Sequence, residues 1–180
     1  MVDYMTDARF CRRIIASAQE VVSGILKHME IVLESCAATD RFGNTLGSKL
    51  RGGEVIELTG DVGAGKTTLT KSLAMGMGIV DDVQSPTFTL SRTYEAPSGL
   101  TLVHYDFYRL HEPGILAAEL EESLSRDDCV VVIEWSGIVQ GILPDDRLTI
   151  EITPTSEQAR QLSVVAGGVK SQALTEAIHI

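Results

Sequence analysis

Residues 54–77 read EVIELTGDVGAGKTTLTKSLAMGM, and this stretch decides the fold. Its first six residues are mostly apolar or β-branched, which indicates a strand. Residues 60–65 contain three glycines, which allow the positive φ angles of a tight loop. Residues 66–77 follow the loop and are predicted to form the helix that leaves it. The stretch therefore predicts a strand, a glycine-rich loop and a helix in direct succession.

The loop has the composition of a phosphate-binding site. Residues 60–67, GDVGAGKT, match the pattern G-x-x-x-x-G-K-[ST]. Glycines remove side chains, so that backbone N–H groups can surround phosphate oxygens, and the following helix points its positive end at the same anion. Lys66 would reach the β- and γ-phosphates, and the Thr67 hydroxyl would bind Mg²⁺. The predicted nucleotide-binding residues are Asp61, Gly63, Ala64, Gly65, Lys66, Thr67 and Thr68.

Strand and helix patterns alternate along the rest of the chain. The patterns predict strands at 29–34, 88–94, 100–106, 129–133, 147–152 and 161–165, and helices at 40–50, 114–124 and 172–178. The run CVVVI at 129–133 is almost wholly apolar, as in a strand buried on both faces. We expect an α/β, P-loop NTPase-like three-layer domain over residues 29–180. Its central sheet should be mixed and mostly parallel, with an antiparallel hairpin near the C-terminus.

Residues 1–28 are predicted to form a helical extension. Phe10, Ile14, Ala18, Val21 and Ile25 recur at helical spacing within 6–28. Three interpretations stay open: the helix packs on the domain, it docks a partner, or the natural chain starts at a later methionine.

Composition limits the compartment and the partners. The three cysteines are widely spaced and form no CxxC motif, which favours reduced thiols over a disulfide framework or a zinc site. We see neither a signal peptide nor an apolar run long enough to span a bilayer, so a cytoplasmic location is expected. The net charge of −10 and the absence of a Lys/Arg cluster disfavour direct binding of DNA or RNA as the main activity.

Three later segments carry candidate catalytic residues. SPTFT at 85–89 contains Thr87, and nucleotide switches often place such a hydroxyl near the γ-phosphate. HYDFYRL at 104–110 places Asp106 at the end of one strand, where it could instead cap the following turn. IEW at 133–135 places Glu134 at the end of the apolar strand. A carboxylate there, beside a P-loop, is where a second Mg²⁺ ligand belongs, and a surface acid is the alternative.

Taken in order, GDVGAGKTT, SPTFTL, HYDFYRL and IEW, followed by Leu143-Pro144, resemble the TsaE family. The resemblance runs from about residue 29 to residue 165. It implies an ATPase needed for threonylcarbamoyladenosine formation in tRNA, with ATP and Mg²⁺ as ligands. It also implies action on the TsaD–TsaB heterodimer, so that tRNA is met only indirectly. Thr67 and Glu134 would bind Mg²⁺, Thr87 would sense the γ-phosphate, and Asp106 would position water or the metal.

The chain departs from the family pattern in its extension and in its first predicted helix. Gly43 stands where a threonine is usual, in a segment that often cups the base. Arg160, near the last strand, is expected either to approach the nucleotide or to lie on the surface. Trp135 is expected to be structural rather than catalytic.

Rival activities can be stated from the same residues. A GTPase should carry an N-K-x-D motif, which is absent from the sequence. A phosphotransferase acting on a small molecule or protein, with Asp106 as its base, remains the alternative. A nucleotide sensor without turnover is the third. Hydrolysis by the isolated protein is expected to be slow, because groups that position the reactants would come from a partner.

Overall fold

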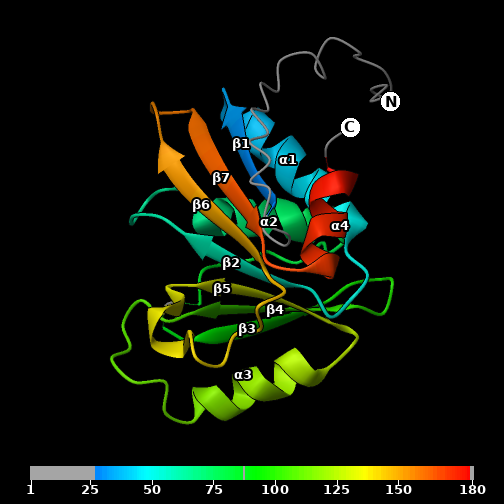
Figure 1. Ribbon diagram of the computed structural model, residues 1–180, viewed down its shortest axis with the longest axis vertical. Helices are drawn as coiled ribbons and strands as arrows, with labels where there is room; N and C mark the ends of the chain where they lie inside the picture. Colours follow the sequence, from blue (N-terminus) through cyan, green and yellow to red (C-terminus); the bar gives the residue numbers. More distant parts are fainter. Residues whose placement is uncertain (1–26, 87, 179–180) are drawn as a thin grey trace.

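One mixed sheet of seven strands organises residues 27–86 and 88–178, which are the residues that the computed structural model describes (Figure 1). Its order across the sheet is β1-β7-β6-β2-β5-β4-β3. The strands are β1 (Lys27–Leu33), β2 (Val55–Thr59), β3 (Ser91–Glu95), β4 (Thr101–Asp106), β5 (Cys129–Glu134), β6 (Leu148–Pro154) and β7 (Arg160–Ala166). The helices are α1 (Cys36–Lys49), α2 (Lys66–Gly76), α3 (Leu116–Ser125), the 3₁₀ turn η1 (Ser136–Val139) and α4 (Val169–Ala177).

The centre of the sheet is parallel and its outer pairs are antiparallel. β6, β2, β5 and β4 pair in parallel, whereas β1–β7, β6–β7 and β3–β4 pair antiparallel. Five of the seven described strands therefore run in the same direction. The predicted mixed, mostly parallel sheet and its C-terminal hairpin, β6 and β7, are confirmed.

Helices cover both faces of this sheet, which confirms the three predicted layers (Figure 1). Helices α1, α2 and α4 pack on one face around residues such as Leu46, Leu73 and Val132. Helix α3 and η1 pack on the other face around Leu120, Val131 and Val139. Strand β5 is buried along its whole length, because it lies in the middle of both cores.

Three predicted starts are wrong by three residues or more, those of β3, α1 and α4, and α4 begins at Val169 rather than residue 172. The strand predicted at 88–94 begins only at Ser91, because residues 88–90 form a turn. Leu90 has φ of 67°, and its N–H donates to Pro86 O, so that the chain there cannot be extended. The first helix begins at Cys36 rather than residue 40, because the Ser35 hydroxyl caps it by accepting from Ala38 N at 3.2 Å.

The predicted helix at 6–28 lies outside the described residues up to residue 26. Its last two residues belong instead to β1, which begins at Lys27. Whether residues 1–28 form a separate extension stays a prediction.

Gly43 has a packing role between α1 and α2. A Cβ at this position would lie 2.5 Å from Ser72 Cβ and 3.1 Å from Leu73 N. A threonine would collide with α2 at this spacing, which accounts for the glycine in this chain.

Within the described stretches, the helices are all too short or too polar to cross a lipid bilayer.

Candidate nucleotide-binding site

Three neighbouring parallel strands bring the candidate residues to one edge of the sheet. The P-loop follows β2, Asp106 ends β4, and Glu134 ends β5, which lies between them. Glu134 is in register with Leu58 of β2 and with Asp106 of β4. Residues in register project from the same face, so that both carboxylates lie on the face covered by α1 and α2, beside the P-loop.

The P-loop backbone depends on its glycines. Gly60, Gly63 and Gly65 have φ of 127°, 79° and 111°. A Cβ on Gly60 would approach Ile152 O to 2.4 Å, whereas a Cβ on Gly63 would meet nothing within 4 Å. Gly60 thus lets the loop lie against β6, and Gly63 leaves an open approach to the loop. Such an approach fits a phosphate group bound by backbone N–H groups at the start of α2.

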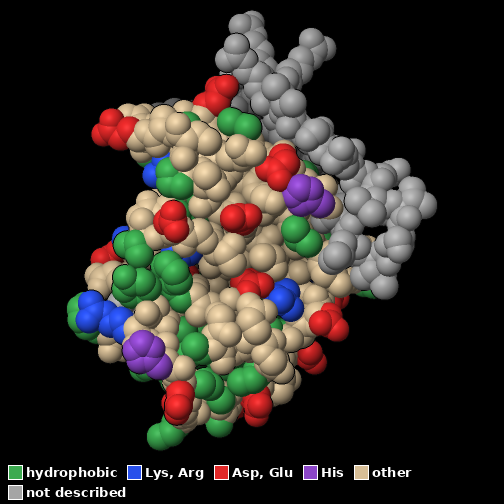
Figure 2. Space-filling model, turned by 60° about the vertical axis from the view of Figure 1, so that its left-hand side comes forward, with side chains coloured by type: hydrophobic (Ala, Val, Ile, Leu, Met, Phe, Trp, Pro, Cys, Tyr) green, Lys and Arg blue, Asp and Glu red, His purple; other side chains and the backbone are tan. Residues whose placement is uncertain are grey.

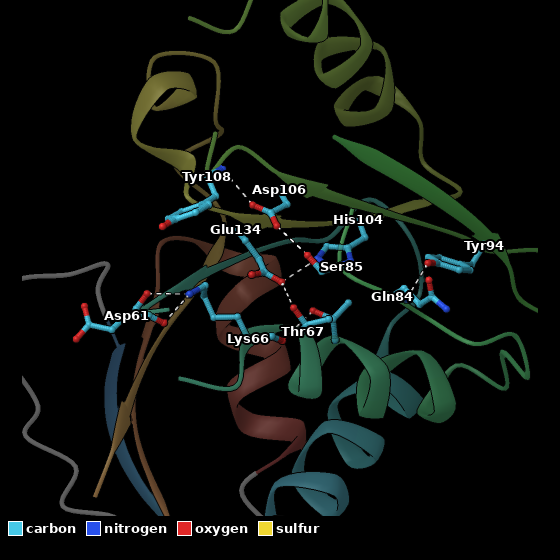
Figure 3. A network of polar contacts seen from close by, with 12 residues as sticks. Asp61, Lys66, Thr67, Gln84, Ser85, Tyr94, His104, Asp106, Tyr108 and Glu134 are labelled. Atoms are coloured by element: carbon cyan, nitrogen blue, oxygen red, sulfur yellow. Dashed lines mark hydrogen bonds and ion pairs between the residues drawn. The ribbon is translucent and has the colours of Figure 1, made fainter. Parts of the chain in front are cut away.

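Lys66 is folded back over the loop (Figure 3). Its Nζ donates to Gly60 O at 2.8 Å and to Asp61 O at 2.9 Å, and it lies 4.4 Å from the centre of the Trp135 ring. Only 5% of the residue is exposed. Burial lowers the pKa of Lys66, although the negative charges of Glu134, Asp106 and Asp61 oppose the shift. A desolvated ammonium group held by two neutral carbonyls would gain from meeting a phosphate.

Thr67 and Glu134 are the predicted metal ligands, and the structure brings them together. The Thr67 hydroxyl donates to Glu134 Oε1 at 3.0 Å, and His104 Nε2 lies 3.0 Å from the same oxygen (Figure 3). Glu134 is 3% exposed. One hydroxyl and one carboxylate are oxygen donors of the kind that Mg²⁺ prefers, so that these residues fit the ion.

A metal site made by protein side chains alone is not found in the described part of the chain. There, no three His, Cys, Asp or Glu residues are grouped so that they could hold an ion. Mg²⁺ commonly keeps waters and binds through one or two carboxylates plus substrate phosphates. The Thr67–Glu134 pair therefore suits a cation that arrives with a nucleotide.

Asp106 joins β4 to the segment before β3. Its Oδ2 accepts from the Ser85 hydroxyl at 2.9 Å, and its Oδ1 accepts from Tyr108 N at 3.0 Å (Figure 3). The second contact is the turn-capping role that the sequence left as an alternative. The first connects Asp106 to the predicted switch segment. Thr87, within that segment, lies outside the described residues.

Arg160, at the start of β7, links the C-terminal hairpin to the P-loop by a hydrogen bond. Its Nε donates to Ala64 O at 2.7 Å, and its Nη1 donates to the carbonyls of Ser156 and Ala159. Of the two expectations for Arg160, the structure therefore supports a place beside the P-loop.

The remaining predicted phosphate-site residues lie along the loop and the first turn of α2. Asp61 and Thr68 are exposed, Gly63 is exposed, Gly65 is half-buried, and Ala64 is fully buried. The Asp61 carbonyl accepts a hydrogen bond from Lys66 Nζ. Contact between Asp61 and a bound nucleotide stays a prediction.

A second polar cluster lies on the opposite face of β2. The carboxylate of Glu57, which is 3% exposed, accepts from Ser136 and Gln140, from Arg147 Nε at 2.7 Å and from Thr149 Oγ1 at 2.9 Å. Burial alone would raise the pKa of Glu57, but these hydrogen bonds outweigh burial and lower it. The cluster ties β2 and β6 to η1, directly after Glu134 and Trp135.

The sequence patterns alone predict no role for His104, Ser85 or Glu57. A signal for His104 was available: it stands two residues before Asp106 on one strand, so that both side chains point to the same face. Glu57 is likewise a single charge inside an apolar strand. Neither residue's position in its strand shows which partner its side chain will contact, because the partners come from elements elsewhere in the sequence.

Exposed aromatic residues flank the site. Phe88 is 83% exposed and lies under the Arg109 guanidinium, whose carbon is 4.6 Å from the ring centre. Tyr108, 49% exposed, packs on Trp135 with ring centres 4.9 Å apart. On the face drawn in Figure 2, hydrophobic side chains gather on one side next to Lys and Arg side chains. The remaining charged side chains of that face lie singly, many of them acidic, so that its described residues form no continuous basic patch.

Comparisons with known proteins agree on one family. A family model described as "Threonylcarbamoyl adenosine biosynthesis protein TsaE" matches residues 33–162. The chain is 37% identical over 131 residues to the "tRNA threonylcarbamoyladenosine biosynthesis protein TsaE" of Streptomyces coelicolor, covering 70% of this chain and 88% of that protein. It is also 37% identical over 143 residues to the protein of that name from Treponema pallidum, covering 76% and 99%.

A solved structure shares the fold. The crystal structure of YdiB from Bacillus subtilis superposes with a TM-score of 0.73 at 30% identity. The match covers 87% of this chain and 97% of YdiB.

Proposed function

The chain belongs to the TsaE family, and from this membership we propose that it is a magnesium-dependent ATPase of tRNA threonylcarbamoyladenosine biosynthesis. The observation that carries the proposal is the hydrogen bond from the Thr67 hydroxyl to Glu134 Oε1. It places a P-loop hydroxyl and a strand-end carboxylate together, as a magnesium–nucleotide complex requires.

The chain's own groups supply binding and orientation. Backbone N–H groups from Gly63 to Thr68 would surround the phosphates, and Lys66 Nζ would exchange the carbonyls of Gly60 and Asp61 for phosphate oxygens. Mg²⁺ held near Thr67 and Glu134 would neutralise charge that develops on the transferred phosphoryl group. Asp106, through Ser85, would hold the switch-like segment that contains Thr87 near the reacting phosphate.

We propose that turnover is slow until a partner binds. The cationic side chains that bond to the P-loop, Lys66 and Arg160, both bind backbone carbonyls in this structure. An arginine or an ordered loop from a partner commonly accelerates phosphoryl transfer by about 10³-fold or more. Exposed Phe88 and Tyr108 border the site and offer apolar contact to such a partner, which we propose is the TsaD–TsaB heterodimer.

The acidic charge of the chain supports an indirect relation to tRNA. A net charge of −10 opposes binding to a polyanion. The proposed ATPase therefore acts on the proteins that handle tRNA, in the cytoplasm.

The destination of the γ-phosphate tests this proposal. Incubation of the protein with Mg-ATP should yield ADP and inorganic phosphate in equal amounts, and Thr67→Val should abolish both. Transfer of the phosphate to a small molecule or to a protein would instead establish the phosphotransferase alternative. Binding of ATP without any ADP formation, with or without partners, would leave a nucleotide sensor.

A further inference from the structure

Among the described residues, the His104 side chain makes one polar contact, and that contact is with Glu134, the candidate metal ligand. The residue lies in β4, is fully buried, and places Nε2 3.0 Å from Glu134 Oε1. Its register partner on β5 is Val132, two residues before Glu134, so that the imidazole reaches along the sheet to the carboxylate. His104 Nδ1 is buried and has no hydrogen-bond partner among the described residues.

The direction of this hydrogen bond follows from the acceptor. A carboxylate oxygen only accepts, so that Nε2 carries the hydrogen and donates it to Glu134. A buried ring nitrogen without a partner is costly. An apolar side chain would fill the same space without that cost, so that the histidine is accounted for by what it does to Glu134 rather than by packing.

Two donors fix the carboxylate of Glu134. The Thr67 hydroxyl and His104 Nε2 meet at the same oxygen, Oε1, from different elements, α2 and β4. Because a carboxylate is planar, fixing Oε1 from two sides also fixes the direction of Oε2. If the Thr67 hydroxyl turned toward a bound metal ion, His104 would be the donor of the two that still held Glu134.

We propose that His104 is a positioning residue that orients the Glu134 carboxylate for the magnesium ion of a bound nucleotide. The inference rests on the proposed function, because it concerns the same site. His104 would thus contribute to the effect of magnesium on nucleotide affinity, although it touches neither the nucleotide nor the metal.

The test uses two variants matched in length. His104→Gln retains an N–H donor near the position of Nε2, and His104→Met does not. Thr101→Val is the control, because Thr101 is also a buried hydrogen-bonding residue of β4 (2% exposed) but bonds to Glu95, away from the site. For each protein, calorimetry gives the dissociation constant of ADP in excess Mg²⁺ and in EDTA, and thermal unfolding reports stability.

Wild type and Thr101→Val should bind ADP more tightly with Mg²⁺ by the same factor. In His104→Met, the factor by which Mg²⁺ tightens ADP binding should fall about tenfold, as expected for the loss of a hydrogen bond to a charged group. The affinity of this variant for ADP in EDTA should be unchanged. His104→Gln should recover most of the magnesium effect, although both substitutions perturb the core similarly. An unchanged magnesium effect in His104→Met, or equal losses in both variants, would overturn the role of His104. If the wild-type protein bound ADP equally well with and without Mg²⁺, the proposed function itself would be contradicted.

Discussion

The Thr67 hydroxyl and Glu134 Oε1 lie 3.0 Å apart, although 67 positions of sequence separate the two residues. The contact joins the first turn of α2 to the end of β5. It exists because parallel strands place their carboxyl ends, and whatever follows them, at one edge of the sheet.

Thr67→Val and Glu134→Gln should each remove most of the magnesium dependence of nucleotide binding. Each takes away one of the two proposed oxygen ligands, which we expect to weaken Mg-ADP binding about tenfold or more. The double variant should be little worse than either single variant, because the two groups act on one ion. Calorimetry with and without Mg²⁺ measures all three. Additive losses would show that the residues act independently.

The fluorescence of Trp135 should report nucleotide binding. Trp135 is the only tryptophan of the sequence, and Lys66 Nζ lies 4.4 Å from its ring centre. Transfer of Lys66 to a phosphate removes a cation from the ring face, so that the emission should change as ATP is added. Lys66→Ala should abolish the response together with binding, whereas Lys71→Ala, an exposed substitution in the same helix, should retain both. A response that survives in Lys66→Ala would contradict this origin of the signal.

Arg160 should support the shape of the P-loop. Arg160→Ala removes the 2.7 Å hydrogen bond to Ala64 O, and Arg160→Lys cannot restore its forked contacts to the 156–159 turn. We expect both variants to bind ADP about fivefold to tenfold more weakly, near 1 kcal/mol, with or without Mg²⁺. Arg126→Ala, which breaks an exposed ion pair with Asp128, is the matched control. Unchanged ADP affinity in Arg160→Ala would remove the bracing role.

Glu57 should make the free energy of unfolding depend on pH in the acidic range. Its pKa is lower in the folded protein than its ordinary value of 4.5, because the hydrogen bonds it accepts outweigh burial. The stabilisation is therefore complete above about pH 4.5 and is lost as the pH falls toward the folded-state pKa. At pH 7, Glu57→Gln should lower the free energy of unfolding by about 2 kcal/mol. Chemical denaturation at several pH values should show this difference shrinking in acid, and a difference that is constant down to pH 3 would contradict the assignment.

Much of the fold could be predicted from local sequence patterns. The apolar run at β5, the strand–loop–helix around the P-loop and the C-terminal hairpin all appear where their periodicity indicates. The errors occur where a side chain or a turn decides a boundary. Because Ser35 caps α1, the helix begins before the residue that the apolar pattern indicates. Because Leu90 has a positive φ, β3 begins after the predicted residue.

The site could be predicted only in part, because most of its contacts join elements that lie far apart in the sequence. The spacing G-x-x-x-x-G-K-T is local, and it assigns Lys66 and Thr67 without further help. The pairing of Glu134 with His104, and of Asp106 with Ser85, depends on strand order and register. No local pattern encodes that order, so these contacts became visible only in three dimensions.

Phosphate release from Mg-ATP, measured for the isolated protein and again after addition of TsaD and TsaB, is the most direct test of the proposed function. We predict slow release alone, well below a typical enzyme turnover near 10 s⁻¹, and clear acceleration by the heterodimer that Thr67→Val abolishes. Fast release by the isolated protein, or release that TsaD and TsaB leave unchanged, would contradict the proposal that this ATPase works on that complex.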